Sequence, residues 1–351
     1  MSEIQRLLER LSNAHGISGR EGSIQEMVRQ EIGPLVDETR VDNLGNLVAT
    51  KKGERPSVMV AAHMDEIGLM TKYVDEKGFL RFVTIGGWFD QTLLNQRVVI
   101  HADSRPIRGV IGSKPPHVMK EEERKKPIEI KDMFVDAGCS DQDEAKALGI
   151  RPGTPMSIDR TFASLAGDRV TGKAFDNRAG VVMMIEALKR TRSKSTIYAV
   201  GTVQEEVGLK GARTSAFDLR PDVALATDVT IPGDHPGIEK KDSNLEIGKG
   251  PVITIADASG RGLIASERVV EWLAETAREF DIAVQMDVSG GGTTDATAIQ
   301  LTREGIHTGL ISVATRYIHS PVEVLSMKDL EASADLIARA LETAPRYFKK
   351  G

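Results

Sequence analysis

Apolar residues recur at helical spacing near both ends of the chain. Ile4, Leu7, Leu8 and Leu11 share one helical face, which predicts a helix close to the N-terminus. A second amphipathic segment follows Ser23, which we expect to act as its N-cap. The same periodicity predicts further helices over residues 141–150, 179–190, 266–280 and 295–305, and from about 326 onward.

Short apolar runs between these helices are typical of buried strands. They are rich in Val, Ile and Ala and scarcely alternate with polar residues, as expected where both faces of a strand are covered. Two earlier strands are predicted on either side of the Asn-Leu-Gly turn at residues 43–45. The apolar runs themselves span residues 57–63, 195–203, 222–227 and 308–314.

The pattern changes from about residue 71, where alternating segments and turn residues carry little helical signal. This region predicts a small antiparallel unit, and its charged run 120–127 predicts a solvated loop. Strands and helices alternate on both sides of the region. We therefore predict an α/β domain of residues 1–68 and 165–351, interrupted by an inserted β-rich domain of residues 69–164.

Composition excludes several classes of protein. The net charge of −5 over 351 residues gives no basic footprint for nucleic acid. No apolar run approaches the roughly 18–20 residues of a membrane-spanning helix, and the N-terminus lacks a secretory signal. Cys139 is the single cysteine, so no disulfide can form within the chain. We expect a cytoplasmic protein with no nucleic-acid or membrane partner.

Two of the seven histidines stand where predicted strands end. His63 ends the first buried strand, and Asp65 follows on the same face if the strand continues. A ligating histidine usually needs a partner for its second ring nitrogen, and a carboxylate can supply it. His319 lies just beyond the run 308–314. Both histidines are therefore candidate metal ligands, although a lone histidine is more often structural.

Carboxylates occupy similar places. Asp228 follows an apolar strand, and Asp176 precedes an apolar helix, where the alternative is a simple helix cap. Glu205 and Glu206 stand side by side after the run 195–203. Neighbouring side chains of extended chain point to opposite faces, which predicts different roles for the two glutamates. Open α/β sheets bind ligands at the carboxyl ends of their strands, so these groups should meet at one edge.

The donor set contains oxygen and nitrogen without thiolate, which suits zinc, cobalt or manganese. It exceeds the three protein ligands of a catalytic zinc site, so a two-metal site with an activated water fits better. Such a site also needs a base that is not a ligand. One of the two glutamates is therefore predicted to bind metal, and the other to carry the proton.

Five segments together resemble the tetrahedral aminopeptidases (TET), which are dinuclear metallo-aminopeptidases related to the glutamyl aminopeptidases. The likeness runs from "HGISGREG" near the N-terminus to the last helix, so it covers nearly the whole chain. The five segments occur in the family's order, and they read "AAHMDEIGLM", "GKAFDNRAG", "VGTVQEEVGLKGA", "ATDVTIPGDHPG" and "RYIHSPVE".

The resemblance implies a role for each candidate residue. His63 and Asp228 would hold one metal ion, Glu206 and His319 the other, and Asp176 would bridge the two ions, most simply zinc or cobalt. Glu205 would be the general base and Asp65 would orient His63. The implied fold is an aminopeptidase-like α/β/α sandwich with a mixed sheet. The insertion would be a PDZ-like dimerisation domain, and dimers would build a tetrahedral homododecamer.

The expected function is removal of the N-terminal residue from peptides that have a free N-terminus. No basic residue can be assigned to a specificity pocket, so a neutral, Leu-like N-terminal residue is expected, with glutamyl or broad specificity as alternatives. A glycoside hydrolase is the rival from another class, because clustered carboxylates serve that chemistry. Carboxypeptidase or deacylase activity and a non-enzymatic metal scaffold also stay open.

Overall fold

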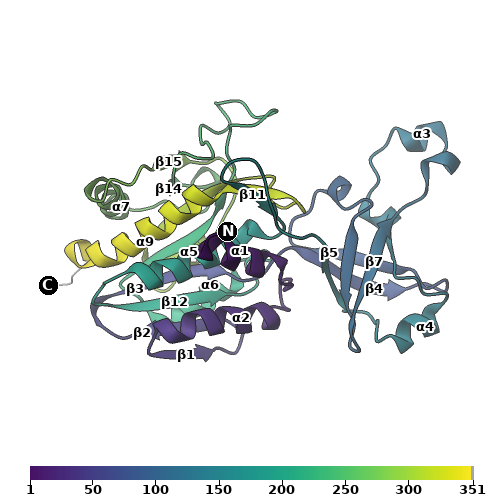
Figure 1. Cartoon of the computed structure of the whole chain (residues 1–351), viewed down its shortest axis with the longest axis horizontal. Helices are drawn as coiled ribbons and strands as arrows, with labels where there is room; N and C mark the ends of the chain where they lie inside the picture. Colours follow the sequence, from purple (N-terminus) through teal and green to yellow (C-terminus); the bar gives the residue numbers. More distant parts are fainter. Residues whose placement is uncertain (349–351) are drawn as a thin grey trace.

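The computed structural model describes residues 1–348. Over these residues it contains a large mixed sheet with helices on both faces and, to one side, a small β-barrel (Figure 1). The helices are α1 Glu3–Asn13, α2 Gly22–Ile32, α3 Glu121–Arg124, α4 Gln142–Ala147, α5 Phe175–Arg190, α6 Lys210–Leu219, α7 Glu267–Glu279, α8 Asp295–Gln300 and α9 Met327–Phe348.

The strands of the large sheet come from both ends of the chain. They are β1 Glu38–Val41, β2 Leu47–Lys51, β3 Glu54–His63, β10 Ala163–Ser164, β11 Arg169–Gly172, β12 Ser195–Thr202, β13 Val223–Thr230, β14 Val252–Ala256, β15 Gln285–Val288, β16 His307–Arg316 and β17 Glu323–Ser326. Their order is β1-β2-β12-β3-β13-β16-β17-β11-β10, and β14 joins β16 to β15. The central strands β12, β3, β13 and β16 are parallel, so their carboxyl ends meet at one edge.

Alternating side chains divide the core of the sheet between two faces. In β3, Val58, Val60 and Ala62 pack in the larger apolar cluster with residues of α1, α2, α5, α7 and α9. Met59 and Ala61 point the other way and pack with residues of α6 and α8. The sheet is therefore a middle layer between two layers of helices, which confirms the predicted α/β class.

The inserted segment forms a closed antiparallel barrel with its own apolar core. The ring order is β4-β5-β8-β7-β6-β9, and Figure 1 shows it beside the sheet with α3 and α4 at its outer side. This confirms the predicted antiparallel unit. Its strands are β4 Gly68–Val74, β5 Leu80–Ile85, β6 Arg97–His101, β7 Pro106–Gly112, β8 Phe134–Asp136 and β9 Pro155–Ile158.

Two local expectations are wrong. Ser23 lies inside α2 rather than at its cap, and its hydroxyl donates to the carbonyl oxygen of His15; Glu21 occupies the N-cap position. The charged run 120–127, expected to be a solvated loop, is exposed but contains the short helix α3. None of the helices within residues 1–348 is both long and apolar enough to cross a membrane.

Candidate metal centre

The predicted site residues come together at the carboxyl edge of the parallel strands. His63 is the last residue of β3, and Asp228 lies near the end of β13. Asp176 stands at the start of α5, and His319 lies between β16 and β17. Together with Glu205 and Glu206 after β12, these residues line one cavity.

Asp176 lies between the two histidines. One of its carboxylate oxygens, Oδ1, is 3.1 Å from Nε2 of His63, and the other, Oδ2, is 3.3 Å from Nε2 of His319. These contacts outweigh the effect of burial, so the pKa of Asp176 lies well below its usual value. Each oxygen of this one carboxylate therefore faces a different imidazole.

His63 is oriented from its other side. Its Nδ1 is 3.2 Å from the backbone oxygen of Asp65 and 3.5 Å from that residue's Oδ1 atom. An N–H on Nδ1 can donate to either oxygen, which leaves Nε2 free to act as a ligand. The structure thus brings Asp65 to the predicted position, although its backbone oxygen is nearer than its carboxylate.

The buried Asp65 carboxylate also fixes the turn that carries the two glutamates. It accepts hydrogen bonds from the backbone N–H groups of Glu205 at 3.0 Å and Glu206 at 3.2 Å. The Ser18 hydroxyl donates to the same carboxylate at 2.6 Å. Three segments that lie far apart in the sequence are therefore held together at the edge of the sheet.

Glu205 and Glu206 do not continue the strand as expected. Strand β12 ends at Thr202, and Gln204 adopts a positive φ of 56°, so the pair lies in a turn rather than on extended chain. The period-two reason for giving them different roles is therefore wrong. Their surroundings differ nonetheless: Oε2 of Glu205 lies 3.8 Å from Nε2 of His63, whereas Oε2 of Glu206 lies 3.2 Å from Nε2 of His319.

The cluster fits divalent cations. Ligand atoms of His63, Glu205 and Asp228 lie within 4.8 Å of one another, and so do those of His63, Asp176 and Glu206. Oε1 of Glu206 is buried without a hydrogen-bond partner within residues 1–348. An acceptor buried in this way is costly unless a cation or donor meets it.

The charges of the cluster also favour the binding of divalent cations. Burial raises the pKa values of Glu205 and Asp228 well above their usual range, and neighbouring carboxylates add to the effect. Glu206 is shifted in the same direction, first by burial and then by Asp176. Within the described part of the chain, no Lys or Arg forms an ion pair with any of these four carboxylates. Metal cations would supply the missing positive charge.

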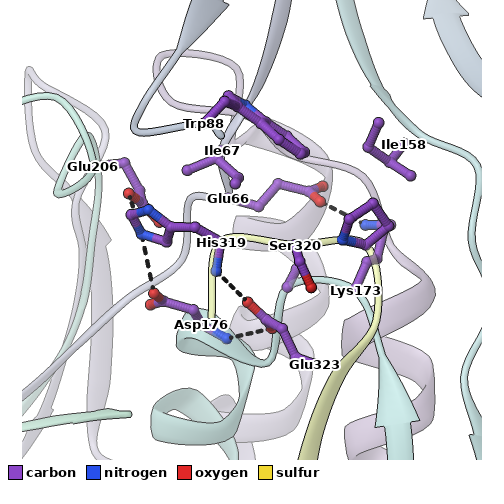
Figure 2. Close-up of a pocket in the computed structure, with 12 residues that line it drawn as sticks. Glu66, Ile67, Trp88, Ile158, Lys173, Asp176, Glu206, His319, Ser320 and Glu323 are labelled. Carbon is purple, nitrogen blue, oxygen red and sulfur yellow. Dashed lines mark hydrogen bonds and ion pairs between the residues drawn. The ribbon is translucent and has the colours of Figure 1, made fainter. Parts of the chain in front are cut away.

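Glu323 is a site residue that sequence reasoning missed. It is 2% exposed, and its two carboxylate oxygens accept separate hydrogen bonds, from the backbone N–H of Asp176 and of His319, both at 3.1 Å. Figure 2 shows dashed lines from this carboxylate to the backbone nitrogens of the two candidate ligands. It closes the quoted segment "RYIHSPVE", but a single acidic residue at the start of a short strand gives no periodic signal.

Asp295 was also missed. It begins α8, is 3% exposed, and accepts a hydrogen bond of 2.5 Å from the Thr202 hydroxyl. Burial raises its pKa to about 6, and its charge helps to raise the pKa of Glu205. The sequence places it only at the start of the helix predicted over residues 295–305, directly after residues 289–294, which line the cavity beside the site.

The cavity is large enough for part of a peptide. Its volume is about 1150 Å³, and it extends from the metal-centre residues across β13, β14 and the loop 289–294. A smaller hollow next to it is bordered by Ile67, Trp88 and Lys173 together with Glu206 and His319 (Figure 2). Substrate can therefore reach the carboxylate and imidazole cluster directly.

Known proteins resemble the chain over almost its whole length. A model of the M42 glutamyl aminopeptidase family matches residues 45–336. An aminopeptidase from the archaeon Desulfurococcus kamchatkensis is 44% identical, with a TM-score of 0.95 over 99% of this chain and 98% of its own. The lysyl aminopeptidase of Pyrococcus furiosus is 35% identical over 96% of each chain. The TET1 peptidase of Pyrococcus horikoshii, which can assemble into a tetrahedron or a large octahedral shell, is 34% identical, with a TM-score of 0.88 over 97% of this chain and 99% of its own.

These similarities confirm the resemblance drawn from the five sequence segments. The matched region, residues 45–336, contains all seven predicted site residues, from His63 to His319. The chain therefore belongs to the M42 glutamyl aminopeptidase family, and it is a peptidase of the hydrolase class.

Proposed function

We propose that this chain removes the N-terminal residue of peptides at a two-metal centre, in which Asp176 would be a ligand of both ions. The observation that carries the proposal is the placement of the two Asp176 oxygens, one facing His63 at 3.1 Å and the other facing His319 at 3.3 Å. Asp228 would complete the site of His63, and Glu206 the site of His319. Zinc and cobalt are the ions that we expect, because both accept this donor set.

Bound there, two divalent ions would act as Lewis acids on the peptide carbonyl and would lower the pKa of a water ligand. The chain supplies the remaining chemistry. Glu205, whose pKa is raised by burial, would take the proton of the attacking water and pass it to the leaving amine. Asp65 would hold Glu205 in place through its backbone N–H. A free α-amine would be recognised next to the centre, which restricts cleavage to the N-terminal residue.

The position of Glu205 makes its assignment testable. Its carboxylate lies within 4.8 Å of ligand atoms of His63 and Asp228, close enough for the three residues to hold one ion. A ligand role is therefore the competing assignment. A base can be replaced without loss of metal, whereas a ligand cannot. Metal content measured beside turnover in Glu205→Gln therefore distinguishes the two.

Two imidazoles within the carboxylate cluster favour the peptidase over the glycoside hydrolase, whose chemistry needs only two carboxyl groups. The test is a set of matched substrates given to metal-free enzyme reloaded with zinc, cobalt or manganese. We expect hydrolysis of aminoacyl anilides, no hydrolysis of their N-acetylated forms or of carboxypeptidase substrates, and loss of activity with a chelator. Chelator-resistant hydrolysis of β-glucans would support the alternative.

We also propose that residues 69–164 form a PDZ-like dimerisation domain and that residues 1–68 and 165–351 form the catalytic domain. The closed barrel with its own core supports this division. The TET1 peptidase's ability to form a tetrahedron supports a homododecamer built from dimers, and light scattering of the purified protein would measure its mass. The preference for a neutral N-terminal residue stays a prediction from sequence. The charges of the cavity wall affect which N-terminal side chain can bind there.

A further inference from the structure

One wall of the large cavity is formed by three neighbouring strands at the edge of the sheet. Thr254 of β14 pairs with Leu310 of β16 on one side and with Asp287 of β15 on the other. Paired residues of adjacent strands point to the same face. All three line the cavity that contains the metal-centre residues, so an acidic side chain stands in a row that a bound substrate can reach.

A second carboxylate lies beside this row. Asp257 follows β14, lines the same cavity and is 4% exposed; Asp287 is 9% exposed. Burial raises the pKa of both carboxyls, and the charge of Asp287 raises that of Asp257 further. Among residues 1–348, no ion pair joins either carboxylate to a cation. Two buried carboxylates without a cation are costly unless a ligand supplies the charge.

Unpartnered polar atoms in this wall point independently to a ligand. Oδ1 of Asp257 accepts a hydrogen bond of 2.6 Å from the Leu263 backbone N–H, but its Oδ2 is buried and has no partner in the described chain. The Ser312 hydroxyl, also lining the cavity, is buried and unpartnered there as well. Both residues line the cavity, and these two atoms keep unused capacity to accept a hydrogen bond.

Within residues 1–348, Lys241 is the one lysine that lines the cavity, and it does not neutralise this wall. The Lys241 ammonium lies 2.6 Å from Oε2 of Glu239, and its side chain is 72% exposed. Next to it, Asp242 accepts a hydrogen bond from the Glu239 backbone N–H. Lys241 therefore belongs to an ion pair at the solvent-exposed part of the cavity, and the two buried aspartates keep their negative character.

We propose that Asp287 and Asp257 form an anionic subsite that selects an N-terminal residue with a cationic side chain, lysine or arginine. The inference rests on the proposed aminopeptidase function, and it replaces the neutral preference expected from sequence. The aliphatic part of such a side chain can pass Leu310 while its cationic end reaches the carboxylates. A hydrogen bond from a cationic group to a carboxylate that is largely shielded from water is strong, so the subsite would favour cationic over neutral side chains.

The test compares lysyl and norleucyl anilides on the metal-loaded enzyme, because norleucine has the stem of lysine without the ammonium group. We expect kcat/KM to be at least about 10-fold higher for the lysyl substrate, with the arginyl substrate also preferred. In Asp287→Asn the ratio should fall by about 10-fold, because the substitution removes the charge that the lysyl ammonium group would meet. Asp257→Asn should lower the ratio in the same direction.

Asp242→Asn is the matched control, because it removes a carboxylate from the same cavity outside the proposed subsite, and the ratio should not change. A wild-type ratio of one or less would overturn the proposal even if a variant failed to fold. An unchanged ratio in Asp287→Asn would overturn it too. Norleucyl hydrolysis reports on the aminopeptidase function separately: if it is present and the ratio is flat, only the subsite is wrong; if neither substrate is hydrolysed, the proposed function itself fails.

Discussion

The carboxylate of Asp65 accepts a hydrogen bond from the backbone N–H of Glu205 at 3.0 Å. The same carboxylate also accepts from Glu206 at 3.2 Å and lies 3.5 Å from Nδ1 of His63. One buried group therefore positions a candidate ligand histidine and the turn that carries both glutamates. This relationship links the geometry of the metal site to the geometry of the proton carrier.

Asp65→Asn should weaken both functions, because an amide replaces one acceptor oxygen with a donor that faces a backbone N–H. Loss of such supporting contacts typically costs about 10–100-fold in metal affinity or activity. Titration of metal-free protein with zinc, beside kcat, measures both. Ser18→Ala is the control, because it removes only one of the hydrogen bonds to Asp65 and should have the smaller effect. Wild-type affinity and kcat in Asp65→Asn would contradict the assigned role.

Glu323→Gln should loosen the two ligands that Glu323 holds through their backbones. Its carboxylate accepts from Asp176 and His319, and glutamine can keep only one of these bonds. An unsatisfied buried group costs about 1–3 kcal/mol. We expect a lower unfolding midpoint in urea and weaker metal binding, whereas the surface substitution Glu304→Gln changes neither. Unchanged metal affinity would show that metal binding does not depend on the two hydrogen bonds that Glu323 accepts.

Lys173→Met should destabilise the fold. Its ammonium lies 2.7 Å from Oε2 of Glu66, and both side chains are at least 96% buried. Removing one partner of a buried ion pair costs about 3–5 kcal/mol of stability. We expect a loss at the lower end of this range, because Arg178, 3.8 Å from Glu66, still partly neutralises the glutamate. Adding Glu66→Gln should recover much of the loss, because it removes the unpaired charge. Urea unfolding of the single and double variants measures this, and equal stabilities for the two would contradict it.

Metal affinity should rise with pH. Hydrogen bonds to Asp176 and Glu206 outweigh the opposing effect of burial and raise the pKa of His319 to about 11 in the metal-free protein. Below that pH the imidazolium must lose its proton before it can bind metal. The stability of the metal-free fold should depend on pH in the opposite direction. The raised pKa of His319 stabilises the fold fully below the usual value of 6.5, and this stabilisation is lost as the pH rises towards 11.

Calorimetric titration with zinc in buffers of different ionisation enthalpy measures this proton release. We expect protons to be released on binding and the apparent affinity to fall between about pH 8 and about pH 6. The same titration of His319→Gln should release fewer protons. Zinc binding that is independent of pH would contradict a ligand role for His319.

Much of the fold follows from sequence pattern, because buried parallel strands and amphipathic helices leave strong periodic signals. The strand ends at His63 and Asp228 could thus be placed in advance. The turn at Gln204, with its positive φ, could not, because the groups that hold it lie far away in the sequence: Glu21 accepts from the Gln204 N–H, and Asp65 accepts from the next two N–H groups. Glu323 and Asp287 were missed for the same reason: single acidic residues in short strands acquire a role only from their neighbours in space.

In the proposed mechanism Glu205 carries the proton and Glu206 binds metal. The most direct test is metal content and kcat measured together on Glu205→Gln and Glu206→Gln. We expect Glu205→Gln to retain two metal ions per chain and to lose at least about 100-fold in kcat, and Glu206→Gln to lose affinity for one ion. A fully active Glu205→Gln protein, or one that has lost a metal ion, would contradict the account.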